Sequence, residues 1–132
     1  MKKSYKGFWL WLAVYCTGFM PIVFAHTDGR TATRLTLLYT GMMLNILMLI
    51  IEKTDSVYWI NGVTFEEAEK AGYENRMAFA HAHLKTFTRF TVFYLIFTLI
   101  CHLMKLSIFV DTIVFTVGLI AAAVSTIKIK LE

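Results

Sequence analysis

The sequence predicts an all-α integral membrane protein, with four transmembrane helices and one extramembrane helix between the second and the third. The first observation is composition: the chain has 132 residues, is 58% hydrophobic and 17% charged, and has a mean hydropathy of +0.62. Soluble domains carry about 25% charged residues. The second observation is that the charges gather between long apolar runs, which is typical of membrane spans. At this length, residues 1–132 are expected to form one four-helix membrane domain.

Four apolar runs approach the length of about 20 residues that a membrane-spanning helix needs. They cover about residues 7–25, 35–51, 87–104 and 107–127. The first run has an alternative interpretation as a cleaved signal peptide, because lysines precede it and the small residues Val23 and Ala25 follow its apolar part. We favour a retained helix, since the run is long for the apolar region of a signal peptide.

The distribution of basic residues predicts the orientation of the spans. With the N-terminus inside, ten lysines and arginines fall on the inner side and three on the outer side. The three outer residues are Arg30, Arg34 and Lys105. Because inner loops of membrane proteins are enriched in Lys and Arg, both termini are expected to be cytoplasmic, most simply at the plasma membrane.

The inner segment, residues 64–86, is expected to be an amphipathic cytoplasmic helix. Thr64 and Glu67 have the spacing of a capping box, in which each side chain satisfies a free backbone donor at the helix start. At 100° per residue, apolar and charged side chains fall on different faces. The candidate cytoplasmic interface on these faces consists of Tyr73, Met77, His81, Leu84 and Lys85.

The sequence leaves two shapes open for this segment. No Gly or Pro follows Gly72 before the turn near residue 105, so the helix could continue into the third span and project from the membrane. Alternatively, it could bend near Thr86 or Thr88 and lie on the membrane surface. Lys85 and Arg89 are expected to mark the cytoplasmic border.

His81 and His83 resemble a metal-binding pair, but helical geometry argues against one. Residues two apart on a helix point about 200° apart, so the two rings cannot chelate one ion. Packing and solvation at the membrane interface are the expected roles, and no metal site is predicted here.

Polar residues at the outer end form a second set of candidates. A metal site or a proton relay is conceivable if they meet, but a structural role is the favoured interpretation for Asp111, because a helix N-terminus and Lys105 could stabilise its charge. The set consists of His26, Asp28, His102 and Asp111.

A third set lies within the spans. Asn45 needs a hydrogen-bond partner in hydrocarbon, and small residues at helical spacing allow helices to approach closely. Helix packing, within the bundle or in an oligomer, is the expected role, and a pathway contact for Asn45 is the alternative. The set consists of Gly41, Asn45, Gly118, Ala122 and Ser125.

The sequence contains no catalytic motif, phosphate-binding loop or basic aromatic surface for nucleic acid. No catalytic residue and no cofactor is therefore predicted. The leading hypothesis is a non-enzymatic accessory, regulatory or immunity-type membrane protein that binds a protein partner or itself within the lipid bilayer. The alternatives are a small oligomeric transporter or channel, and a small membrane enzyme or metal-binding protein.

Overall fold

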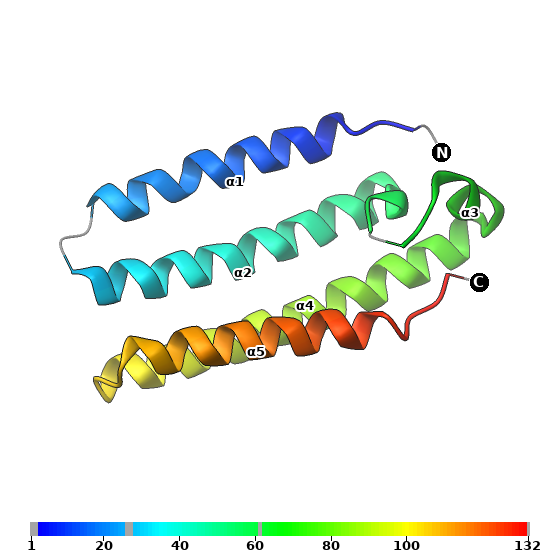
Figure 1. Cartoon of the computed structure of the whole chain (residues 1–132). Coiled ribbons are helices and arrows are strands. Elements are labelled where there is room, and N and C mark those ends of the chain that lie inside the picture. The colour runs from blue at the N-terminus through cyan, green and yellow to red at the C-terminus, as the bar shows by residue number, and fades with distance from the viewer. Residues whose placement is uncertain (1–2, 26–27, 61, 132) are drawn as a thin grey trace.

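The computed structural model describes residues 3–25, 28–60 and 62–131, and all regular structure in these ranges is helical (Figure 1). Four helices are long and apolar enough to cross a membrane, which confirms an all-helical, multi-pass membrane protein. The long helices are α1 (Lys6–Ala25), α2 (Gly29–Thr54), α4 (Gly72–Leu103) and α5 (Ile108–Thr126), and the short ones are η1 (Val57–Trp59) and α3 (Phe65–Lys70).

Helix α2 is the centre of the arrangement. It packs against α1 on one side and against α4 and α5 on the other, and α4 also packs on α5. No residue of α1 is buried, so this helix lies at the edge of the bundle. The first and last described residues lie near η1 and α3 at one end, called here the terminal end (Figure 1). The end of α1, the start of α2 and the α4–α5 connection lie at the opposite end, called the turn end (Figure 1).

Aromatic side chains fill much of the interface between α4 and α5. The ring centroid of Phe115 lies 5.4 Å from that of Phe90 and 4.9 Å from that of Tyr94. All three side chains are buried. The outward face of α5 is instead apolar and exposed, for example at Ile113 and Val117. Such a face suits lipid, which is as apolar as the side chains themselves.

Helix α4 passes through the predicted junction without interruption. Its 32 residues include Thr86 and Thr88, where a bend was one of the two expected shapes. The Thr86 hydroxyl donates to the carbonyl of Ala82 in the preceding turn and so stays within the helix (3.0 Å). The break comes earlier, at Gly72, whose φ of +77° separates α3 from α4. A left-handed conformation of this kind suits glycine because it has no Cβ atom.

Two contacts set the register between α2 and α4. Thr88 donates a hydrogen bond to Asn45 (2.8 Å), and Arg76 pairs with Asp55, so residues 76–88 run beside residues 45–55 rather than projecting beyond them. Asn45 lies seven residues before Glu52, a distance of about 10 Å along the helix. Arg89 follows Thr88 and is therefore level with the apolar part of α2 along the bundle.

A small side chain at Gly118 permits the close contact between α5 and α4. A Cβ atom at Gly118 would lie 2.7 Å from the ring of Phe90, which the rings of Tyr94 and Phe115 hold in place. Gly118→Ala is expected to lower the free energy of unfolding by about 1–3 kcal/mol, the usual cost of overpacking. Thermal unfolding in detergent micelles measures it.

Gly29→Ala is the matched control, because in the described part of the chain no atom outside the adjacent residues and the local helix backbone lies within 4 Å of the added Cβ. Equal unfolding temperatures for the two variants would show that Gly118 is not needed for packing.

Candidate functional site

A buried ion pair at the turn end joins α2 to α5. The Arg34 guanidinium donates to Oδ2 of Asp111 through Nε (3.0 Å) and Nη2 (2.9 Å). Nη2 also donates to the carbonyl of Leu106 (2.9 Å), and the Thr98 hydroxyl donates to Oδ1 of Asp111 (2.8 Å). Arg34 is 7% exposed and Asp111 is fully buried. Both charged groups are therefore satisfied by partners from α2, α4, α5 and the turn, and the pair supports the bundle.

The outer-end candidates that the structure describes do not form one site. Asp111 pairs with Arg34, not with Lys105 as considered from the sequence. Asp28 caps α2, where the Thr31 hydroxyl and backbone amides lower the pKa of its carboxyl. His102 is exposed, and His26 lies outside the described residues. Within the described ranges, no group of three or more His, Cys, Asp or Glu residues could hold a metal ion.

Asn45 lies in a hydrogen-bond network that joins α2 to α4. Its amide nitrogen donates to the Gly41 carbonyl (2.9 Å) and to the Thr91 hydroxyl, and its amide oxygen accepts from Thr88 (2.8 Å). Thr91 also donates to the Gly41 carbonyl (3.2 Å). The network satisfies Asn45 inside the bundle, which supports the packing role over the pathway role.

The other small residues of this set also serve contacts within the chain. A Cβ atom at Gly41 would touch Thr91, and Gly118 faces Phe90. Ala122 is buried, and the Ser125 hydroxyl donates to the Ala122 carbonyl of its own helix (2.7 Å).

A second ion pair lies at the terminal end. Arg76 donates to both carboxylate oxygens of Asp55, at 2.7 and 2.6 Å, and to the carbonyl of Ala68 (3.0 Å). Asp55 is the C-cap of α2 and has a left-handed backbone, with φ of +53°. Arg76 therefore joins the end of α2 to the end of α3.

The predicted capping box of α3 is confirmed. Thr64 accepts from the Glu67 backbone amide (3.2 Å), and the Glu67 carboxylate accepts from the Thr64 backbone amide (2.8 Å). The Thr64 amide lowers the pKa of Glu67 most, and the Thr64 hydroxyl adds to this effect.

The candidates of the predicted cytoplasmic interface separate into different environments. His81 is exposed and its Nδ1 lies 2.9 Å from Glu52, whereas His83 is 3% exposed and faces the interior. The two rings thus lie on different faces of α4. Of the other candidates, Tyr73 and Lys85 are exposed, and Met77 and Leu84 are half-buried.

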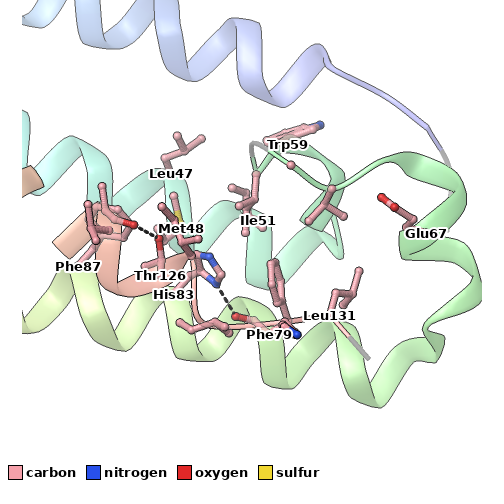
Figure 2. A pocket seen from close by; sticks show the side chains of 18 of the residues that line it. Leu47, Met48, Ile51, Trp59, Glu67, Phe79, His83, Phe87, Thr126 and Leu131 are labelled. Carbon is pink, nitrogen blue, oxygen red and sulfur yellow. Dashed lines mark hydrogen bonds between the residues drawn. The ribbon is translucent and has the colours of Figure 1, made fainter. Parts of the chain in front are cut away.

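Two hollows lie beside the C-terminal half of α5, where alanines follow one another. The α4–α5 groove, about 590 Å³, is lined by residues that include Arg89, Phe93, Ala121 and Ser125. The inner pocket, about 920 Å³, opens at the terminal end between α2, α4 and α5 and contains His83 (Figure 2).

Lys85 and Arg89 differ from Arg76, the remaining Lys or Arg residue of α4, which pairs with Asp55. Both are exposed, and neither forms an ion pair with a described residue. They are four residues apart and therefore lie on the same face of the helix. The α4–α5 groove includes Arg89, so this cation borders a hollow in the apolar surface.

No protein family model, curated protein or solved structure matches this chain. Sequence reasoning missed the partners Arg34, Asp55 and Arg76. The available signal was that oppositely charged residues fall on the same predicted side: Arg34 and Asp111 at the outer end, and Asp55 and Arg76 in the inner segment between the second and third spans.

Proposed function

We propose that this chain is a small non-enzymatic membrane protein that acts by binding another membrane protein, in an accessory, regulatory or immunity-type role. The observation that carries the proposal is Arg89, an exposed cation beside the apolar part of α2 with no ion-pair partner among the described residues. With the N-terminus inside, as the distribution of Lys and Arg predicts, the termini and α3 are cytoplasmic, and the membrane is the plasma membrane.

Arg89 differs from the buried arginines of the bundle, which are paired within the chain. Arg34 and Arg76 each have a carboxylate partner within the chain. An ionisable residue within the membrane has a high free energy unless it is paired or reaches the interface. Such a residue is therefore a candidate functional residue. Arg89 has no such partner in the described chain, which supports a partner from outside.

The α4–α5 groove supports a transmembrane helix as that partner. Ala121 and Ser125 are small, and small residues allow two helices to approach closely in lipid. A carboxylate on the partner helix would pair with Arg89 in a charge-assisted hydrogen bond. A second copy is a poorer match, because the described carboxylates nearest this depth, Asp111 and Glu52, already contact Arg34 and His81.

Site-specific photocrosslinking in native membranes tests the proposal. A photoreactive residue at Ala121 should capture a membrane protein that has an acidic residue in one span. Arg89→Glu should abolish the adduct, whereas Arg30→Glu, at an exposed arginine at the turn end, should leave it unchanged. Replacing the partner's acidic residue with arginine should restore the adduct with Arg89→Glu.

Three outcomes would contradict the proposal. These are an adduct with lipid only, an adduct with a second copy only, and a protein adduct whose yield does not depend on the charge at position 89.

A further inference from the structure

The inner pocket shares Ile129 with the α4–α5 groove but otherwise has different lining residues, which come from distant parts of the chain. Leu47, Met48 and Ile51 of α2 form one wall, and Phe79, His83 and Phe87 of α4 form another (Figure 2). The end of α5, the tail to Leu131 and residues from η1 to α3, such as Trp59, complete the lining. Its volume of about 920 Å³ is within the range of about 300–1,000 Å³ typical of small-molecule sites.

His83 is the buried polar side chain among the residues that line this pocket. Its Nδ1 lies 2.9 Å from the carbonyl of Phe79, and its ring centroid lies 4.3 Å from the Phe79 ring. A carbonyl oxygen only accepts hydrogen bonds, so Nδ1 carries the hydrogen. In the neutral imidazole, Nε2 is therefore the hydrogen-bond acceptor.

The acceptor at Nε2 has no hydrogen-bond partner among the described residues. Figure 2 shows the second ring nitrogen on the side away from the Phe79 carbonyl, toward Met48. Among the described side chains, only the Tyr94 hydroxyl is fully buried without a partner, so Nε2 of His83 is accessible from the pocket. A hydroxyl or other donor from a ligand could therefore bond it. The surrounding Leu47, Ile51 and Phe87 provide only apolar contacts.

We infer that the inner pocket binds a lipid-soluble alcohol, with its apolar body against the aliphatic and aromatic walls and its hydroxyl donating to Nε2 of His83. The apolar walls favour a hydrocarbon chain or ring, and the acceptor on His83, which lies among Leu47, Ile51 and Phe87, favours a ligand with one donor there. Trp59 lines the same pocket, so its indole should report occupancy. This inference uses a different surface from the proposed protein interface and can fail independently of it.

The test compares 11-bromo-1-undecanol with its methyl ether, which has the same apolar chain but no hydroxyl donor. Bromine quenches Trp59 fluorescence in the purified full-length chain in detergent micelles, and the Trp59→Phe variant gives the background from other tryptophans. The alcohol should quench saturably, with a half-saturating concentration about tenfold below that of the ether, the preference expected for one hydrogen bond.

His83→Phe should remove the tenfold preference while retaining an aromatic ring in the pocket wall. His81→Phe is the matched control, because His81 is exposed on another face of the same helix, and it should keep the preference. Equal binding of alcohol and ether to the unmodified chain, a preference that persists in His83→Phe, or no saturable quenching by either compound would overturn the inference.

A second measurement avoids dependence on the variant's folding. With ¹⁵N-labelled histidine in the unmodified chain, the Nε2 resonance of His83 should shift with the alcohol and not with the ether. Identical responses to the two compounds would also overturn the inference.

Discussion

Asp111→Leu is expected to lower the free energy of unfolding by about 3–5 kcal/mol, because it leaves the Arg34 guanidinium buried without its counter-charge. Thr98 would also lose its acceptor on Asp111. The remaining contacts of Arg34, with the carbonyls of Leu106 and Cys101, provide no counter-charge. Thermal unfolding in detergent micelles, followed by circular dichroism, measures the loss.

The double variant Arg34→Leu/Asp111→Leu separates the pair's net contribution from the cost of an orphaned charge. Replacing both members of a buried pair with apolar residues is often neutral or stabilising, so the double variant should be more stable than Asp111→Leu alone. Arg30→Leu is the surface control, since Arg30 is exposed near the same end of α2. An Asp111→Leu protein as stable as the Arg30→Leu protein would contradict the structural role of the pair.

Arg76→Lys is expected to lower the free energy of unfolding by about 2–3 kcal/mol, although it keeps the charge. The guanidinium bonds both oxygens of Asp55 and the carbonyl of Ala68 at once. A lysine ammonium is a compact charge that cannot reproduce this planar, bidentate geometry. The loss should appear in the same unfolding measurement, and hydrogen exchange should be faster in α3, whose last turn is released.

A variant at Asp55 distinguishes the contribution of the ion pair from that of the backbone conformation. Asp55→Gly suits the left-handed conformation but removes the carboxylate, so it should be about as unstable as Arg76→Lys. Lys85→Arg is the matched control, because Lys85 is an exposed cation of the same helix. Unchanged stability in both Arg76→Lys and Asp55→Gly would show that this ion pair does not hold the terminal end together.

Local signals in the sequence predicted the helices well. Long apolar runs require helices in a membrane because each backbone polar group must be satisfied within its own segment. The Thr64–Glu67 capping box is equally local, since both partners lie within one turn, and the structure contains both of its hydrogen bonds. The continuity of α4 through Thr86 and Thr88 was left open because threonine alone neither requires nor prevents a bend.

The pairing between helices was not predictable from the same signals. Thr88 opposite Asn45 sets the register of α4 against α2, which hydropathy alone does not determine. Asp111 lies close to Lys105 in sequence, yet its partner Arg34 lies 77 residues away on another helix. Such contacts depend on the rotation and register of whole helices, which one sequence does not determine.

The polar contacts within the bundle join helices that are synthesised at different times. Arg34, Asn45 and Asp55 all belong to α2 or its cap, and their partners on α4 and α5 are synthesised later. A chain that stops after α2 therefore lacks the carboxylate that pairs with Arg34, and Asn45 retains only its contact with the Gly41 carbonyl of the same helix. We therefore expect the first two helices to be less stable in the membrane until α4 and α5 have been synthesised.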